Sequence, residues 1–274
     1  MRLIRSFIPY LFAVSLLAIP CAAPAAVVVS VTATIAPPPL PVYVQPPIPG
    51  PGYIWTPGYW AWGPYGYYWV PGTWILPPAV GLYWTPGYWA WGGGVYLWHV
   101  GYWGPHVGFY GGINYGFGYV GVGYVGGYWD HGVFAYNRAF NNIQNNTHIT
   151  NIYNKTVVTN INVTRVSFNG GAGGVVAQAT LQEEAAFRER HNPATAQQVR
   201  HEQAAAGNHA LLASVNQGHP TIAATRRPGQ FSGGVVAAEG ASPQGQPVRK
   251  GNGPHHPPHG PGNGGGPEHG EQHP

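Results

Sequence analysis

Aromatic residues and glycines recur with a regular spacing through the first half of the chain. A Trp-x-x-Gly-x-Trp motif occurs four times, beginning at residues 55, 69, 84 and 98. The residues around each motif are mostly aromatic or β-branched, a composition that favours strands. In three copies the middle of the motif is Pro-Gly, which suits the two central positions of a type II turn. We therefore expect a tight hairpin at each motif, with its two tryptophans packed together from neighbouring strands.

The four copies combine into a larger unit. Copies one and three are nearly identical, reading YIWTPGYWAWG and LYWTPGYWAWG, so a double repeat that begins at residue 55 and begins again at residue 84 is the better unit. Further turns are expected between the motifs, at Pro64, at residues 77–78 and at residues 92–94. The pattern predicts an antiparallel meander of strands about five residues long. In the fourth copy His99 and Val100 replace the usual Thr/Val-Pro pair, so its turn is expected to differ.

Polar strands and then helices are predicted beyond the aromatic region. Residues 141–168 are rich in Asn, Thr, Ile and Val, which indicates strands with one polar face. After a glycine-rich break, Thr180 and Glu183 form a capping box for one helix, and Thr195 begins a second. The expected helical stretches are residues 180–191, 196–205 and a short turn at 208–215.

The N-terminus has the organisation of a signal peptide. Arg2 and Arg5 precede a short apolar run, and small residues allow cleavage after Ala25. Lipidation at Cys21 and retention of the segment as an anchor are the alternatives. Cleavage after Ala25 leaves a mature chain without cysteine, which excludes disulfides and cysteine metal sites.

Together these patterns predict a mainly β protein. Short antiparallel hairpin or meander repeats rich in Trp and Gly are followed by Asn/Thr-rich strands, a small helical segment and a disordered tail. The proline-dense stretch before the repeats is expected to be an extended spacer or surface arm. The expected segments are a signal peptide (1–25), a proline-rich lead-in (36–52), the aromatic repeat domain (53–130), an Asn/Thr-rich β segment (131–168), a helical segment (175–215) and a disordered Gly/Pro/His-rich tail (216–274).

Charged residues are almost absent from the aromatic region. From residue 6 to residue 137, Asp130 is the only Asp, Glu, Lys or Arg, and no Ser occurs from residue 31 to residue 166. That region therefore lacks the residues for an acyl-transfer triad or for the paired carboxylates of a glycosidase, and we expect neither an enzyme nor a cofactor. The formal charge of +4 includes Arg2 and Arg5 of the signal segment, so no nucleic-acid partner is expected.

Three groups of residues carry candidate chemistry. The tryptophans either fill a thin core or form an exposed aromatic platform for sugar rings or a cage for cations; they are Trp55, Trp60, Trp69, Trp74, Trp84, Trp89, Trp98 and Trp103. The tail histidines either collect a transition metal or belong to a solvated low-complexity segment; they are His255, His256, His259, His269 and His273. Asp130 and His131 are either an acid–base or metal pair or, as we favour, turn residues after Trp129.

The stretch PPPLPVYVQPPIPGPGYIWTPGYWAWG and the repeated motif resemble the bacterial WXXGXW (YXWGXW) repeat family over residues 36–130. The resemblance implies an exported, envelope-associated protein and no particular activity. We expect a non-catalytic cell-envelope protein with a structural or interaction role, located in the periplasm, at the outer membrane or outside the cell. The alternatives are a module that binds cell-wall glycan through exposed Trp and Tyr, and metal binding through the His-rich tail. The partner is expected to be cell-wall glycan or another envelope protein, with membrane association only through an uncleaved or lipidated N-terminus.

Overall fold

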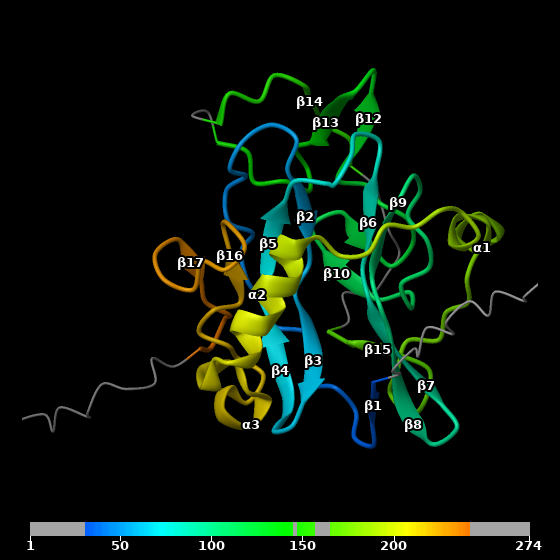
Figure 1. Ribbon diagram of the computed structural model, residues 1–274, viewed down its shortest axis with the longest axis vertical. Helices are drawn as coiled ribbons and strands as arrows, with labels where there is room; N and C mark the ends of the chain where they lie inside the picture. The colour runs from blue at the N-terminus through cyan, green and yellow to red at the C-terminus, as the bar shows by residue number, and fades with distance from the viewer. Residues whose placement is uncertain (1–30, 145–146, 157–164, 242–274) are drawn as a thin grey trace, which may run out of the picture.

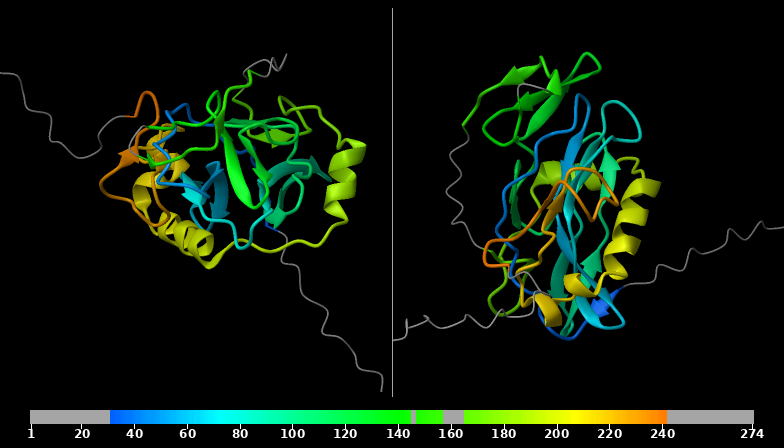
Figure 2. Two further views of the ribbon diagram at one scale, coloured as in Figure 1. Left: turned by 90° about the horizontal axis from the view of Figure 1, so that it is seen from above. Right: turned by 90° about the vertical axis from the view of Figure 1, so that its left-hand side faces the viewer.

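The computed structural model describes residues 31–144, 147–156 and 165–241, and within these ranges the protein is mainly β (Figure 1). Its strands are short and pair in several small sheets. Two hairpins built from the Trp-x-x-Gly-x-Trp motifs run side by side through the molecule, and short helices flank them (Figures 1 and 2). The expected fold class is confirmed.

The first hairpin is folded from motif copies one and two. Its strands are β2 (Ile54–Thr56), β3 (Tyr59–Gly63), β4 (Gly66–Val70) and β5 (Gly72–Ile75). β3 pairs with β4 next to the turn at Pro64 and Tyr65, and β2 pairs with β5 further from it. This register puts Trp60 opposite Trp69 and Trp55 opposite Trp74, and in both pairs the ring centroids lie 5.1 Å apart.

The second hairpin repeats this arrangement with copies three and four. Its strands are β6 (Tyr83–Thr85), β7 (Tyr88–Gly92), β8 (Val95–His99) and β9 (Tyr102–Gly104). Trp89 is opposite Trp98, Trp84 is opposite Trp103, and the chain turns at Gly93 and Gly94. β1 (Thr32–Ala33) and β15 (Phe168–Asn169) add to the two edges of the β7–β8 pair. The double repeat, which the near-identity of copies one and three indicates as the unit, is therefore one hairpin.

The expected hairpin turn at each Pro-Gly is wrong. Trp55 and Trp60 do not pair with each other, because the chain continues in one direction through Pro57 and Gly58. Proline has no N–H to donate to a ladder, so the pairing is interrupted at Pro57 and resumes beyond it. The break in copy two falls at the same level as the break in copy one, so both arms of the hairpin are interrupted together.

The proline-rich lead-in is extended, but it is not a spacer or surface arm. Leu40 and Ile48 are buried against the repeats. The indole N–H of Trp60 donates to the carbonyl of Pro39 (3.1 Å), and that of Trp74 donates to the carbonyl of Pro46 (2.9 Å). An extended proline-rich chain has carbonyls that no ladder uses, and buried indole N–H groups need acceptors. The lead-in is therefore part of the core.

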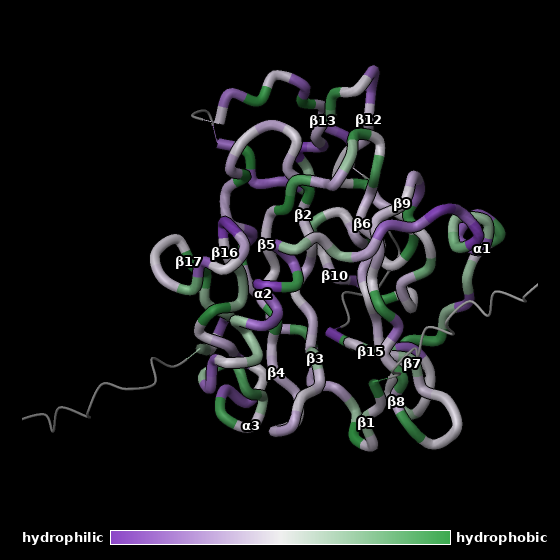
Figure 3. The backbone as a smooth tube through the Cα atoms, viewed as in Figure 1, coloured by the Kyte–Doolittle hydropathy of each residue, from purple (hydrophilic) through white to green (hydrophobic). Residues whose placement is uncertain are grey.

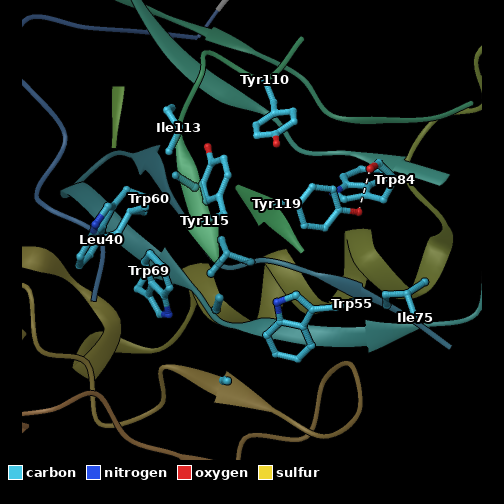
Figure 4. Packing of buried hydrophobic residues seen from close by; sticks show 14 of the residues in the cluster. Leu40, Trp55, Trp60, Trp69, Ile75, Trp84, Tyr110, Ile113, Tyr115 and Tyr119 are labelled. Carbon is cyan, nitrogen blue, oxygen red and sulfur yellow. Dashed lines mark hydrogen bonds between the residues drawn. The ribbon is translucent and has the colours of Figure 1, made fainter. Parts of the chain in front are cut away.

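The Gly- and Tyr-rich stretch after the second hairpin covers that hairpin on one side. β10 (Asn114–Gly116) and β11 (Tyr119–Val120) form a small hairpin. The hydroxyl of Tyr119 donates to the carbonyl of Trp84 (2.8 Å), as Figure 4 shows, and that of Tyr115 donates to the carbonyl of Gly87. β12 (Gly127–Asp130), β13 (Val133–Asn137) and β14 (Ile152–Tyr153) form a further sheet at the top of Figure 1.

The predicted helices are present and begin where the capping residues placed them. α1 (Leu181–Phe187) has a capping box of Thr180 and Glu183, and α2 (Ala196–Ala206) has one of Thr195 and Gln198. Two short helical turns follow, η2 (His209–Leu211) and α3 (Ala213–Asn216). Two of the three predicted stretches are thus confirmed closely, while α1 ends earlier than residue 191.

The expected Asn/Thr-rich strands over residues 141–168 are largely wrong for the described residues. In the described parts of 141–168, only Ile152–Tyr153 and the start of β15 are strands. Asn side chains there bond to backbone instead of facing out from a sheet: the amide of Asn141 donates to the carbonyls of Gly126 and Asn137. Such local side-chain bonds compete with strand pairing.

The tail does not become disordered at residue 216. β16 (Ala224–Thr225) adds in parallel to β5, and β17 (Val235–Val236) pairs with β16. Ala224 and Thr225 are fully buried, and the indole N–H of Trp69 donates to the carbonyl of Ala223 (2.9 Å). The small residues of this segment let it approach the first hairpin closely. The prediction of disorder is based on composition and does not take this packing into account. The predicted disordered tail beyond residue 241 lies outside the described residues, as does the predicted signal peptide.

Candidate functional site

The first tryptophan of every motif copy lies over the glycine of the copy with which it pairs. A Cβ added to Gly72 would lie 2.5 Å from Cζ2 of Trp55 and 3.0 Å from the backbone nitrogen of Gly58, too close for any side chain. None of the four motif glycines has a positive φ, so the lack of space, and not the backbone conformation, requires glycine. The ring-over-glycine pairs are Trp55 with Gly72, Trp69 with Gly58, Trp84 with Gly101, and Trp98 with Gly87.

The eight tryptophans considered as an aromatic platform lie mainly in the core. Seven of them are buried, with exposed fractions from 0 % at Trp55 to 8 % at Trp84, and Figure 4 shows several of them packed together. The eighth, Trp98, is half-buried, and Tyr59 stacks on it with ring centroids 5.0 Å apart. A sugar ring needs a free aromatic face, so the structure supports the core interpretation of these rings over the platform.

The second tryptophan of each copy ties the hairpins to other parts of the chain through its indole N–H. Trp60 and Trp74 bond to the lead-in, as described above. Trp89 donates to the carbonyl of Trp60 (2.7 Å), which joins the two hairpins, and Trp103 donates to Oε1 of Gln198 on α2 (2.8 Å). Each motif thus supplies one ring that covers a glycine and one ring that makes a long-range hydrogen bond.

A small, partly open cavity lies between the two hairpins, at the level where the Pro-Gly segments interrupt the strands. Its volume is about 70 Å³, room for a few water molecules. Both hairpins line it, with α2 along one side; its polar side chains include Thr73, Gln198 and Glu202. Glu202 is the acidic side chain among its lining residues.

Glu202 accepts hydrogen bonds from the hydroxyls of Tyr59 and Tyr68. Burial raises the pKa of the Glu202 carboxyl, and the two hydroxyls offset this only in part. Burial, helped by the charge of Glu202, raises the pKa of Tyr68 to about 12. A single carboxyl held by two phenols lacks the acidic partner that glycoside hydrolysis requires, and it fastens α2 to the first hairpin. Sequence reasoning missed this trio, because no local pattern connects a helix residue with two strand residues so far away.

His201 fastens the C-terminal segment to the first hairpin. Its Nε2–H donates to the carbonyl of Pro71 (2.8 Å), and its Nδ1 accepts from the N–H of Gly229 (2.9 Å). The ring stacks on Phe231 with centroids 5.2 Å apart. Burial lowers the pKa of His201, with a smaller opposing effect of the Pro71 carbonyl, so the ring is neutral and uses both nitrogens.

The remaining candidates are the Asp130–His131 pair and the histidines of the tail. Nδ1 of His131 lies 2.6 Å from the Asp130 carboxylate, but both side chains are largely exposed, and His131 has a positive φ in the turn between β12 and β13. The turn interpretation fits this geometry. Among the described residues there is no cluster of three or more His, Cys, Asp or Glu that could hold a metal. The five tail histidines lie outside the described residues.

The comparison with protein families agrees with this architecture. The WXXGXW repeat family matches the chain in two copies, at residues 50–74 and 83–103, which correspond to the two hairpins. The resemblance inferred from the sequence is confirmed for these segments. No curated protein and no solved structure matches the chain. Within the described ranges, none of the helices has the length and apolar character that crossing a membrane requires.

Proposed function

We propose, for a chain with two WXXGXW repeats, the role of a non-catalytic exported protein of the cell envelope that acts as a structural or interaction module. The observation that carries the proposal is the reciprocal packing of tryptophan over glycine in all four copies. This packing explains, by folding alone, why the motif needs both tryptophan and glycine. No role in a reaction is needed to explain the four glycines.

The chemistry of the central cavity supports the same proposal. Glu202 is the only carboxylate among the described residues that line it, and its two tyrosine partners hold it in place. The hydroxyl of Thr56 is also used, because it donates to the carbonyl of Thr73 (2.9 Å). A nucleophile with an adjacent base is the usual requirement for covalent catalysis, and these residues are committed to the scaffold.

Fractionation of the native cells, with mass measurement of the purified N-terminus, tests export. We expect the protein in the periplasmic, outer-membrane or extracellular fraction, with a mass that begins after Ala25. A mass increase at Cys21 would establish lipidation instead, and an intact N-terminus in the cytoplasmic fraction would overturn the proposal.

Incubation of the folded protein with isolated cell-wall sacculi tests the absence of catalysis. We expect no soluble fragments by mass spectrometry, with the variant Glu202→Gln as the matched control. Fragments released by the native protein and not by this variant would identify an enzyme and contradict the proposal.

A further inference from the structure

A groove open to the surface lies between α1 and the loops around the β12–β13 hairpin. Its volume is about 480 Å³, within the range of sites that bind small molecules. The groove is distinct from the central cavity and shares no residue with it. The residues that matter are three tyrosines on one side and three polar side chains on the other: Tyr83, Tyr124 and Tyr128, with His106, Gln182 and Glu189.

The tyrosine side of the groove is held in place from behind. The hydroxyl of Tyr83 accepts the backbone N–H of Trp129 (3.0 Å), and its ring lies 6.3 Å from that of Tyr124. Tyr128 rests against Tyr153 with centroids 5.3 Å apart, yet 48 % of it is exposed. These rings therefore have fixed positions, and part of their surface is free to contact a ligand.

The polar side of the groove offers planar groups that both donate and accept hydrogen bonds. Nδ1 of His106 lies 2.7 Å from Oε1 of Glu189, with 72 % of the His106 side chain exposed. Oε2 of the same carboxylate is buried and has no hydrogen-bond partner among the described residues. Gln182 is exposed at the rim and adds an amide. A carboxylate, an amide and an imidazole suit pairs of neighbouring hydroxyl groups.

We propose that this groove binds a neutral sugar unit of a glycan chain. A sugar ring has a face of C–H groups that packs on an aromatic ring, and edges of hydroxyls that each donate and accept. The described lining residues include no Lys or Arg, which disfavours an anionic ligand, and the one carboxylate is already shared with His106, which disfavours a cation. Glu189 has no second carboxylate beside it in the groove, so the site suits binding and not hydrolysis.

The inference deepens the proposed function, since it rests on an interaction role and names the partner class and the surface. The aromatic side of this site is made of tyrosines, of which Tyr124 and Tyr128 lie beyond the repeats and Tyr83 lies in β6 of the second hairpin. Trp129 follows Tyr128 directly, and its backbone N–H donates to the Tyr83 hydroxyl, so we expect tryptophan fluorescence to change when the groove is occupied.

Titration of the full-length protein with chitotetraose, cellotetraose and maltotetraose tests the proposal, with tryptophan fluorescence and calorimetry as readouts. We expect saturable binding of at least one of them. Tyr128→Ala and Gln182→Ala should each weaken it by about tenfold, the equivalent of 1.4 kcal/mol. Tyr65→Ala is the matched control, because Tyr65 is 80 % exposed at the turn of the first hairpin, and it should leave binding unchanged.

Absence of binding to all three oligosaccharides would overturn the inference, as would equal weakening by Tyr65→Ala and Tyr128→Ala. Thermal unfolding of each variant separates a lost contact from a lost fold. Neither outcome affects export or the lack of catalysis, which the fractionation and the cell-wall digestion test independently.

Discussion

Each motif glycine in this protein leaves space for the indole ring of a tryptophan in the paired copy. The four motif glycines have no positive φ, so their backbone conformation does not by itself require glycine. What they share is a partner's indole ring at a distance that no Cβ tolerates. Because Trp and Gly are three residues apart, the Trp of each copy covers the Gly of its partner copy, and its own Gly is covered in return. The motif therefore works only when two copies are paired.

Gly72→Ala should destabilise the fold by about 3 kcal/mol, the upper part of the usual range for overpacking a core. The new methyl group would collide with Trp55 on one side and with the backbone of Gly58 on the other. Gly92→Ala is the control, because a Cβ there meets only Leu97 at 3.7 Å, and it should stay within about 1 kcal/mol of the native protein. Chemical denaturation followed by fluorescence measures both, and similar midpoints for the two variants would refute the steric explanation.

His201 should make the protein less stable in mild acid. Its pKa is lowered by burial in the folded state, so the unfolded chain takes up the proton more readily and protonation favours unfolding. The contribution of the neutral ring is complete above pH 6.5, the ordinary pKa of histidine, and is lost as the pH falls through the lower folded value.

The measurement is the thermal midpoint against pH for the native protein, His201→Gln and His131→Asn. His201→Gln should have a flatter profile below pH 6.5, while His131→Asn, at an exposed turn, should follow the native curve. The pKa of Glu202 is raised in the folded state, so this residue makes folding more favourable as the pH falls. Glu202 is present in all three proteins and therefore does not affect the comparison between them. A native profile with no decline toward acid, or one that His201→Gln does not flatten, would contradict the assignment.

At the scale of helices and strands, the sequence predicts the features that depend on residues close together in the chain. It does not predict the features that depend on partners far away in the chain. Thr180 and Thr195 identify both helix starts, because a cap is made within four residues. Pro-Gly misleads, because the same dipeptide suits a turn and an interruption in paired strands, and only the partner strand decides between them. Hydropathy also gives little help: Figure 3 shows β3 and β4 in pale shades, although the aromatic rings of these strands belong to the core.

The segment from residue 217 to residue 241 should contribute measurably to stability, despite its loop-like composition. A chain that ends after Asn216 loses the carbonyl that accepts the N–H of buried Trp69, a group whose unsatisfied burial costs about 1–3 kcal/mol. It also loses β16 beside β5, including the hydrogen bond between Thr225 and Thr73.

The control is a chain that ends after Ala241, which keeps these contacts. We expect a native melting temperature for the longer chain and a clearly lower one for the shorter chain by circular dichroism. Equal melting temperatures would mean that the segment adds nothing to the fold.

At the scale of the whole molecule, the two hairpins depend on each other and on chain segments far away in sequence. Trp89 bonds to the carbonyl of Trp60, and Tyr59 stacks on Trp98. The lead-in supplies acceptors to the first hairpin, and α2 reaches both hairpins through Gln198 and Glu202. The sequence shows the repeat unit, but these cross-connections follow no period and could not be predicted from it.

Such connections predict that the hairpins unfold as one cooperative unit, which a matched pair of variants can test. Gly72→Ala strains the first hairpin and Gly101→Ala the second, because a Cβ at Gly101 would lie 2.6 Å from Cζ2 of Trp84. Hydrogen exchange with mass spectrometry should show both hairpins losing protection together in either variant, since contacts such as the Trp89–Trp60 hydrogen bond make the loss of one hairpin remove partners from the other. Selective loss of protection in the strained hairpin alone would show that each double repeat folds independently.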